Sequence, residues 1–360
     1  MKSKLDRKLG VGIVGCGAVA DVHLNALKKM NELQIVAVCD KDNRRAQSTS
    51  TAWRIGSYYT DMQRMLDDED ISIVSVLTPP SAHAQVAIEA LKHNTNVLVE
   101  KPLTMTTTDA DSIRNALNSS NAKLTMDYNW LFCRVIQEAL SRLRPGLGGA
   151  IQAMEVICLH TATEPMAAEP NHWSHKLSGG RFAEVLPHPI YLLQSFLGDD
   201  LTVKNVTTQK VGPHAWMKSD ECHVVLQSDQ SVGNIYISFN APRAAILVDI
   251  YAAHEVIRID LMNQTIIKLG QAVEKSIKVG QSGVTNIEAG KATLGVVQDL
   301  TRQALRNVIH SLRYRQGEYA LRKIYGEFAE SITGHSEPPV SFDTAYNTVR
   351  ITEEVCDKIT

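Results

Sequence analysis

A glutamate and a histidine four residues apart have the spacing in this sequence best suited to acid–base chemistry. Glu184 and His188 lie in the segment Gly179–Pro189. On a helix this spacing puts both side chains on one face, where the carboxylate can orient or charge the imidazole. Pro187 and Pro189 oppose a continuous helix interior, so the helix is either kinked or begins near Pro187 with Glu184 in the preceding turn. A purely structural pair is the alternative. We expect no metal, because no third ligand at a zinc-like spacing accompanies the pair.

A loop of small residues near the N-terminus is of the type that binds a dinucleotide. Gly15, Gly17 and Ala20 follow a short apolar run that predicts a strand, and an apolar pattern of helical period comes next. Gly15 would permit the tight turn, Gly17 the approach of a pyrophosphate, and Ala20 close packing of helix on strand. The predicted cofactor contacts in this loop are Gly15, Gly17, Ala18, Val19 and Ala20.

Asp40 bears on the choice of cofactor. It lies 20 positions after Ala20, at the end of the second predicted strand. An aspartate there accepts hydrogen bonds from the ribose hydroxyls of NAD, whereas the 2′-phosphate of NADP would be repelled. Arg44 and Arg45 could hold such a phosphate, but as solvated residues of the following helix they need no such role. The sequence therefore favours NAD, with NADP as the weaker alternative.

Three further polar groups follow predicted strands, at the edge where parallel sheets bind ligands. They are Thr78-Pro79-Pro80 with His83, Glu100-Lys101-Pro102, and Asp127-Tyr128-Asn129. A lysine between a buried strand and a proline is a stronger functional signal than a lysine elsewhere on the surface. His83, early in a helix, suits a structural cap as well as a cofactor contact. The predicted cofactor contacts from these groups are Thr78, Pro79, His83, Glu100, Lys101 and Asn129.

The elements that would position these residues differ between the two parts of the chain. Up to about residue 128, near-continuous apolar strands alternate with helices, which predicts a parallel sheet covered on both faces. Beyond it, strands follow one another without helices, which predicts a mainly antiparallel, open sheet. The predicted fold class is α/β, with a doubly wound Rossmann domain (residues 1–128), an α+β substrate and oligomerisation domain (129–342) and a C-terminal helix (343–360).

Two surfaces of the second domain have predicted roles. Along residues 232–240 apolar and mixed positions alternate, so an apolar sheet face left uncovered would be buried between subunits. We therefore expect a homodimer or homotetramer. A long helical region covers about 294–333, with Leu305, Val308, Ile309 and Leu312 on one face and Arg302, Arg306, His310 and Arg313 on the other. A solvated basic face is the expectation, with phosphate capture or a subunit contact as alternatives.

Composition excludes several classes of protein. The 360 residues are 44% apolar, which fits two ordinary domains and excludes a disordered chain. Lys and Arg number 37 against 39 Asp and Glu, so no basic field favours nucleic acid. Neither a signal peptide nor an apolar stretch of about 18 residues is found, which predicts a cytoplasmic protein without a membrane span. The six cysteines show no paired motif and are expected to be reduced.

Together these motifs resemble the glucose–fructose oxidoreductase / inositol dehydrogenase (Gfo/Idh/MocA) family. The resemblance covers nearly the whole chain and is strong for fold and cofactor, because the Glu-Lys-Pro triplet and the distant histidine are independent of the glycine loop. The matching motifs are Gly15-x-Gly17-x-x-Ala20-x-x-His23, Asp40, Thr78-Pro79 with His83, Glu100-Lys101-Pro102, Gly179-Gly180 followed by His188, and Pro338-Pro339-Val340-Ser341 with the final helix.

The resemblance implies an NAD(P)-dependent oxidoreductase. Hydride would pass between the nicotinamide and a secondary alcohol or ketone of a sugar, sugar derivative or nucleotide sugar. His188 would take the hydroxyl proton, Lys101 would stabilise the developing alkoxide, and Glu184 would orient the imidazole. The resemblance also implies that Pro102 follows a bond that can be cis.

Three departures from the family pattern fall on the substrate side. Glu184 replaces an aspartate, Tyr191 replaces the aspartate three residues after His188, and Leu131 replaces a common arginine. One alternative is an NAD-retaining lyase, epimerase or glycosidase that acts through a transient ketone, which net cofactor consumption would distinguish. Another is a nonenzymatic nucleotide-binding sensor, but binding alone would need neither Lys101 nor His188.

Overall fold

The computed structural model describes residues 8–143, 150–269, 297–308, 317–334 and 336–359. The chain divides into two compact units. Unit 1 comprises Met1–Phe132 with Gln316–Glu353, and unit 2 comprises Cys133–Arg315 with Glu354–Thr360.

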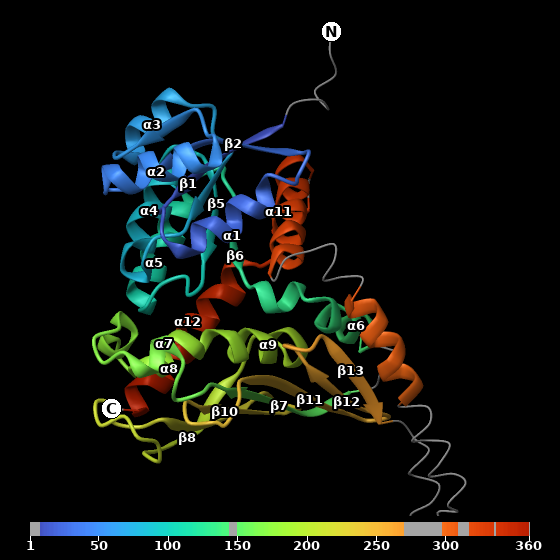
Figure 1. The fold of residues 1–360 in the computed structure, drawn as a ribbon. Coiled ribbons are helices and arrows are strands. Elements are labelled where there is room, and N and C mark those ends of the chain that lie inside the picture. Colours follow the sequence, from blue (N-terminus) through green and yellow to red (C-terminus); the bar gives the residue numbers. More distant parts are fainter. Residues whose placement is uncertain (1–7, 144–149, 270–296, 309–316, 335, 360) are drawn as a thin grey trace, which may run out of the picture. The chain divides into compact units, whose positions relative to one another are not determined.

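Unit 1 is built on a six-stranded sheet of order β3-β2-β1-β4-β5-β6, in which neighbouring strands are parallel (Figure 1). Its strands are β1 (Leu9–Val14), β2 (Leu33–Cys39), β3 (Ser57–Tyr59), β4 (Ile73–Val76), β5 (Asn96–Glu100) and β6 (Leu124–Asp127). Since β1 lies between β2 and β4, the strand order reverses there, and the carboxyl end of β1 is where such sheets bind ligands. The predicted doubly wound domain is confirmed.

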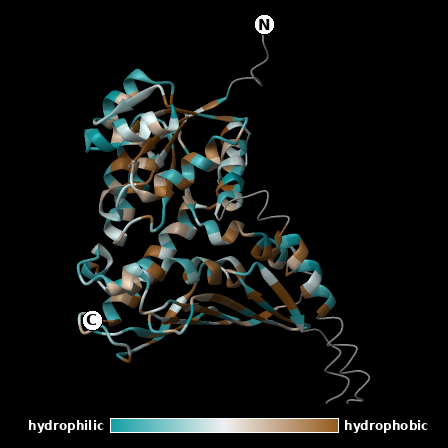
Figure 2. Cartoon of the chain, in the orientation of Figure 1, coloured by the Kyte–Doolittle hydropathy of each residue, from teal (hydrophilic) through white to brown (hydrophobic). Residues whose placement is uncertain are grey.

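Helices connect these strands. They are α1 (Ala18–Leu27), α2 (Asn43–Trp53), α3 (Met62–Asp68), α4 (Pro80–Lys92) and α5 (Thr107–Asn118). Asp42, Asp61 and Thr106 cap α2, α3 and α5 with side chains that accept backbone N–H groups. Helix α2 is largely polar, as its hydrophilic colour in Figure 2 shows, so packing of a few small residues has to hold it on the sheet.

A helix from late in the sequence belongs to unit 1. Helix α11 (Glu318–Thr333) packs on α1 and on the 3-10 helix η2 (Asn129–Phe132). The Glu318 carboxylate accepts a hydrogen bond from Asn25 and pairs with Lys29, at 3.1 and 2.5 Å. The sequence prediction assigned 129–342 to the second domain, whereas the structure groups 316–353 with the first. The reason is this long-range packing, which no local pattern reveals. Helix α12 (Phe342–Ile359) begins in unit 1 and ends in unit 2.

Unit 2 is built on a seven-stranded sheet of order β13-β12-β11-β7-β10-β9-β8. Its strands are β7 (Ile151–Leu159), β8 (Thr202–Gln209), β9 (Glu221–Gln227), β10 (Val232–Ser238), β11 (Ala245–Ala252), β12 (Val256–Asp260) and β13 (Thr265–Leu269). Only the β7–β10 pair among them is parallel. The mainly antiparallel sheet is therefore confirmed. The helices before and beside it are α6 (Arg134–Arg142), α7 (Pro165–Ala168), η3 (Trp173–Lys176), α8 (Arg181–Val185) and α9 (Pro187–Leu197).

The apolar face of this sheet is covered within the chain. Helix α9 packs on β7 and β10, and Leu193 and Leu197 lie against Gly233. The expectation that this face is left uncovered is therefore wrong. The opposite face is of mixed character. His223 stacks on Tyr236, whose hydroxyl donates to a Glu221 oxygen at 2.6 Å. The homodimer or homotetramer stays a prediction.

A helix over residues 297–308 differs from its predicted packing. Leu305 and Val308, expected on a buried face, are 63% and 56% exposed. Gln303 is buried instead, and its amide both donates to and accepts from the backbone of Ile266 on the edge strand β13, at 2.7 and 2.6 Å. Polar pairing with a strand edge thus replaces apolar packing. Arg302 and Arg306 are exposed, as a solvated face requires. The other predicted members, Ile309, His310, Leu312 and Arg313, lie outside the described residues.

Two further expectations concern cysteines and membranes. All six cysteines are free thiols, as predicted. Burial raises the pKa of Cys39 and of Cys222 to about 12, so these two thiols stay protonated. In the described part of the chain, no helix combines the length and apolar character needed to cross a membrane.

Candidate functional site

The glycine loop between β1 and α1 has one glycine that the fold requires and one that leaves space. Gly15 has φ +102°, and a Cβ there would lie 2.6 Å from the backbone carbonyl of Leu77. A larger residue is therefore excluded. A Cβ at Gly17 would have no atom within 4 Å. The chain itself does not require glycine at this position, but a pyrophosphate approaching the start of α1 would. Ala18 opens that helix, Ala20 is buried, and Val19 is 43% exposed.

The Asp40 carboxylate is held over this loop by backbone donors. Its Oδ2 accepts from the backbone N–H of Cys16 and its Oδ1 from that of Asp42, both at 2.9 Å. A carboxylate oxygen that accepts one hydrogen bond can accept another, so the ribose hydroxyls of NAD suit this group. The Arg45 guanidinium lies 3.7 Å from an oxygen of Asp42, which gives it a partner other than a phosphate.

The loop after β4 supplies a second fit to a cofactor. The hydroxyl of Thr78 is buried and has no hydrogen-bond partner among the described residues, which a polar ligand would satisfy. Pro79 precedes α4 as its N-cap. His83 is buried, and its ring nitrogens lie 2.8 Å from the Thr78 carbonyl and 2.7 Å from that of Pro102. Burial lowers the pKa of His83. Of the two roles that the sequence left open for His83, this placement favours the structural cap over the cofactor contact.

Lys101 follows β5, and a side chain holds its backbone. The N–H of Lys101 donates to Glu100 Oε2 at 3.1 Å, and the Lys101–Pro102 bond is cis. Glu100 was predicted to contact the cofactor. Its other oxygen, Oε1, instead lies 3.0 Å from His23 Nε2, inside unit 1. Asn129, the last predicted contact of this group, opens η2.

Five polar side chains from five elements, here called the His23 cluster, meet at this point. They are His23 of α1, Ser75 of β4, Glu100 of β5, Asp127 of β6 and Tyr325 of α11. His23 Nδ1 lies 2.9 Å from the Tyr325 hydroxyl, which lies 2.7 Å from Ser75 Oγ. His23 Nε2 is 3.4 Å from Asp127 Oδ2. The sequence indicated His23 only as part of a motif, and Ser75 and Tyr325 were missed because their partners are far away in the chain.

Burial and charge set the protonation of this cluster. Burial and the nearby Glu100 carboxylate raise the pKa of Asp127 to about 7. Burial alone would lower the pKa of His23, but Tyr325, Asp127 and Glu100 together raise it well above the usual value. Ligand atoms of His23, Glu100 and Asp127 lie within 4.8 Å of one another, as metal ligands do. The imidazole bonds to Glu100, whereas both carboxyl oxygens of Asp127 are buried and have no hydrogen-bond partner among the described residues. The absence of a metal stays a prediction.

In unit 2, the segment predicted to carry acid–base chemistry forms two short helices. Helix α8 ends at Val185 and α9 begins at Pro187, so Glu184 lies in the turn before α9, one of the two predicted geometries. Gly179 and Gly180 both have positive φ, and a Cβ at Gly179 would lie 2.5 Å from Cys356 Sγ. Backbone conformation therefore favours glycine at both positions, and close packing requires it at Gly179 as well.

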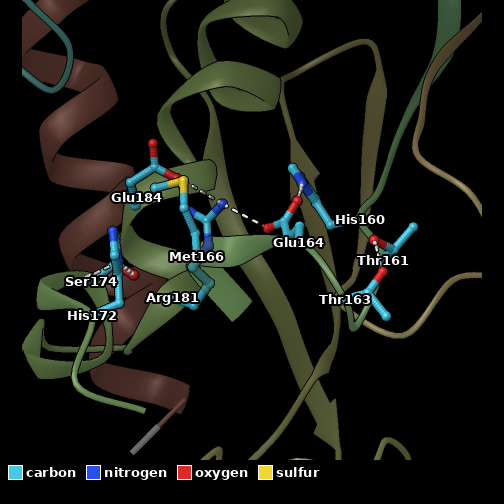
Figure 3. A network of polar contacts seen from close by, with 9 residues as sticks. All are labelled: His160, Thr161, Thr163, Glu164, Met166, His172, Ser174, Arg181 and Glu184. Carbon is cyan, nitrogen blue, oxygen red and sulfur yellow. Dashed lines mark hydrogen bonds and ion pairs between the residues drawn. The ribbon is translucent and has the colours of Figure 1, made fainter. Parts of the chain in front are cut away.

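Arg181 connects Glu184 to a larger polar network (Figure 3). Its side chain is 3% exposed, and its guanidinium pairs with both Glu184 and Glu164, the latter at 3.1 Å. The second oxygen of Glu164 lies 3.0 Å from His160 Nδ1. Although burial raises the pKa of Glu164, His160 and Arg181 outweigh that effect and lower it. The Glu164 carboxylate thus holds its charge beside a permanent cation. The sequence did not single out Arg181, although its spacing of three from Glu184 was visible.

His188 is held by a hydroxyl. Its Nδ1 lies 2.8 Å from Tyr191 Oη, and Tyr191 is fully buried. Tyr191 occupies the position where the family pattern has an aspartate. The predicted partner, Glu184, forms an ion pair with Arg181. The role of Glu184 in orienting His188 stays a prediction, and Tyr191 is an orienting group that the sequence left unassigned.

The fold and site of unit 1 define a dinucleotide-binding α/β domain, with an open glycine loop, a fixed aspartate and an orphan hydroxyl at the carboxyl ends of parallel strands. Residues 9–128 match the model of the GFO_IDH_MocA oxidoreductase family, described as an NAD-binding Rossmann fold. The match covers this domain, about a third of the chain, and its description makes NAD the cofactor type of the domain.

Named relatives match parts of the chain. It is 25% identical over 205 residues to oxidoreductase P35 of Formosa agariphila, covering 56% of this chain and 64% of that protein. It is 33% identical over 118 residues to inositol 2-dehydrogenase of Salmonella paratyphi B, covering 32% of this chain and 35% of that one. The matches thus span about a third to two thirds of these relatives.

A solved structure is similar over nearly the whole chain. The WlbA dehydrogenase of Bordetella pertussis, in complex with NADH and UDP-GlcNAcA, superposes with a TM-score of 0.75 at 16% identity. The alignment covers 98% of this chain and 96% of that one. At this identity the likeness shows the fold of both units.

Proposed function

We propose that this protein is an NAD-dependent dehydrogenase that oxidises a secondary alcohol of a sugar, sugar derivative or nucleotide sugar, or reduces the corresponding ketone. The observation that carries the proposal is a lysine fixed by its backbone at the end of β5 in an NAD-binding sheet. Binding alone would not need a cation there. The names of relatives that act on inositol and bind a UDP-sugar support the substrate class.

Bound NAD would supply the hydride acceptor of this reaction. Gly17 and Asp40 would hold its pyrophosphate and ribose, and the orphan hydroxyl of Thr78 would satisfy a polar group of the cofactor. Asp40 leaves no favourable place for a 2′-phosphate, which is why we propose NAD and not NADP.

The chain's own side chains would move the proton and stabilise charge. For oxidation, His188 must accept the hydroxyl proton on Nε2, which requires the tautomer in which Nδ1–H donates to Tyr191 Oη. Lys101 would stabilise the negative charge that develops on the substrate oxygen. Glu184, held by Arg181, would contribute fixed negative charge to the same reaction.

Absorbance at the wavelength of reduced nicotinamide tests the proposal with purified protein, NAD⁺ and a panel of polyols, sugars and UDP-sugars. We expect stoichiometric NADH and a ketone product from at least one compound. Substrate conversion without net NADH would indicate a cofactor recycled in place. Tight NAD binding without conversion of any compound would favour a sensor.

A further inference from the structure

The His23 cluster links the cofactor loop to the backbone of Lys101. Helix α1 starts directly after Gly17, and His23 lies in its second turn. From there a chain of hydrogen-bonding groups runs through Glu100 to the N–H of Lys101, and on the other side through Tyr325 to Ser75. The helix that begins at the glycine loop and the end of β5 are thus joined by one imidazole.

We propose that His23 and Tyr325 are positioning residues for Lys101, which act by holding the Glu100 side chain that fixes the Lys101 backbone. The proposal rests on the proposed function only in giving Lys101 a part in catalysis. A lysine that stabilises charge on a substrate atom has to be placed within a fraction of an ångström, and a misplacement of about 1 Å can cost roughly a hundredfold in rate.

Burial makes this arrangement specific. His23, Asp127 and Tyr325 are each at most 1% exposed. An ionised Glu100 in such surroundings needs a donor or a cation, because a buried unpaired charge is costly. His23 supplies it, and the proton on Asp127 lets the second carboxyl group remain neutral beside the first. The cluster therefore contains one imidazolium, one carboxylate and one carboxylic acid, with no net charge.

The loss of His23 would change the surroundings of Lys101. The charge of Lys101 already lowers the pKa of Glu100, after the larger effects of burial and His23. Without its donor, the Glu100 carboxylate would therefore interact more strongly with the Lys101 ammonium. If the Glu100 carboxylate turns toward the Lys101 ammonium, the ammonium becomes harder to deprotonate. The neutral amine of Lys101, which reacts with acylating reagents, would then be rarer.

The test measures Lys101 without substrate or cofactor. Wild type and His23→Leu, His23→Gln and Tyr325→Phe variants of the full chain are treated with a limiting acylating reagent, and mass spectrometry gives the labelling rate of each lysine. Lys92, exposed at the end of α4, is the internal reference. Ser331→Ala is the matched control, because it removes another buried hydroxyl of α11 whose hydrogen bond stays within that helix.

We expect His23→Leu to slow Lys101 labelling at least threefold relative to Lys92, and Tyr325→Phe to slow it less. His23→Gln should restore part of the rate, because its amide can still donate to Glu100. Ser331→Ala should match wild type. With an active substrate, kcat should fall about tenfold or more in His23→Leu, while NADH affinity measured by fluorescence stays within about twofold.

The outcomes separate this proposal from the proposed function. Wild-type labelling of Lys101 in folded His23→Leu and Tyr325→Phe variants, with unchanged kcat, would overturn the positioning role even in an active dehydrogenase. If no alcohol is oxidised by wild type but Lys101 labelling changes as expected, the positioning role stands and the dehydrogenase assignment fails. Circular dichroism shows whether each variant is folded. If His23→Leu does not fold, Tyr325→Phe, which retains the aromatic ring, still provides the test.

Discussion

Each unit contains two carboxyl groups beside one basic side chain, but the two sets differ in how deeply they are buried. In unit 1, His23 serves Glu100 and Asp127; in unit 2, Arg181 serves Glu164 and Glu184. Asp127 is 1% exposed and keeps a proton up to about pH 7. The carboxylates in unit 2 are partly exposed, and Glu164 has His160 as a second partner.

This difference shows that burial, more than the ratio of charges, decides whether a carboxyl group ionises. Water and a second hydrogen-bonding partner stabilise the charge of Glu164, whereas complete burial beside Glu100 makes a charge costly at Asp127. The guanidinium of Arg181 cannot lose its charge in the physiological range, while an imidazole can. We therefore expect unit 1 to respond to pH and the Arg181 network to be largely insensitive to it.

The largest effect should come from removing the two predicted catalytic groups, one in each unit. Lys101→Ala should lower kcat about a hundredfold or more, by loss of a charge-stabilising donor. His188→Ala should lower it by roughly 10²–10⁴, by loss of the proton acceptor. Steady-state kinetics with the substrate found in the panel gives both values. NADH affinity and the melting temperature should stay near wild type.

The pH profile separates these two variants. In wild type, kcat/KM for oxidation should fall at acid pH, because a protonated imidazole cannot accept the substrate proton. His188→Ala should lack this limb, whereas Lys101→Ala should retain it. Near-full activity of His188→Ala would show that another residue is the base, and Tyr191 or Tyr128 would be the next candidates.

The second effect concerns unit 1 alone. Asp40→Ala removes the acceptor held over the glycine loop, and hydrogen bonds to a charged group are worth about 1.5–3 kcal/mol. NADH affinity should therefore fall about tenfold to a hundredfold, while NADPH affinity changes little. Fluorescence titration with both reduced cofactors measures this. Tighter binding of NADPH than NADH by the unmodified protein would contradict the assignment and give Arg44 or Arg45 a role in phosphate binding.

Local patterns sufficed for most strands of both sheets and for the loops that follow the strands of unit 1. The glycine loop, Asp40 and the residue after β5 could be predicted because strand, turn and helix signals are adjacent in sequence. The short strand β3, only Ser57–Tyr59, was not predicted. Tyr325 could not be assigned to the site either, because it lies 302 residues from its partner His23 and only tertiary packing brings them together.

In unit 2 the structure adds partners that the sequence did not single out. The spacing of Glu184 and His188 suggested a mutual contact, which stays a prediction, and α8 ends at Val185 while α9 begins at Pro187. Arg181 and Tyr191, three residues before Glu184 and after His188, are the partners that the structure describes. Spacing along the sequence alone cannot decide which polar residues of one short segment pair with one another.

A smaller effect should decide which of these neighbours orients His188. Tyr191→Phe removes one hydrogen bond to Nδ1, which is worth about 1 kcal/mol, so kcat should fall roughly five- to tenfold. Glu184→Gln should lower kcat by a smaller factor, since Arg181 keeps its pairing with Glu164. Both are measured at the pH optimum of wild type. A larger loss in Glu184→Gln than in Tyr191→Phe would make the carboxylate the orienting group.

The last effect is on stability, not on activity, and distinguishes the two units by sign. Asp127 has a pKa of about 7 when folded, against an ordinary value of 3.8, so unfolding releases a proton between these pH values. Unfolding therefore becomes easier as pH rises through this window, by at most about 1.4 kcal/mol per pH unit, and the lost stability is not regained above pH 7.

Asp127→Asn cannot ionise, so its melting temperature should rise relative to wild type by a few degrees between pH 5 and 8.

Asp220 of unit 2 is the matched comparison. Burial raises its pKa, but Lys210 and the backbone N–H groups of Val211 and Gly212 outweigh this and lower it. Its stabilising charge is present above the unfolded pKa and is lost on acidification. Asp220→Asn should therefore melt below wild type at pH 8, and the difference should shrink in acid. Calorimetry from pH 4 to 8 measures both series. Equal slopes for Asp127→Asn and wild type would show that Asp127 is ionised in the folded protein, and the contrast in protonation between the two clusters would then fail.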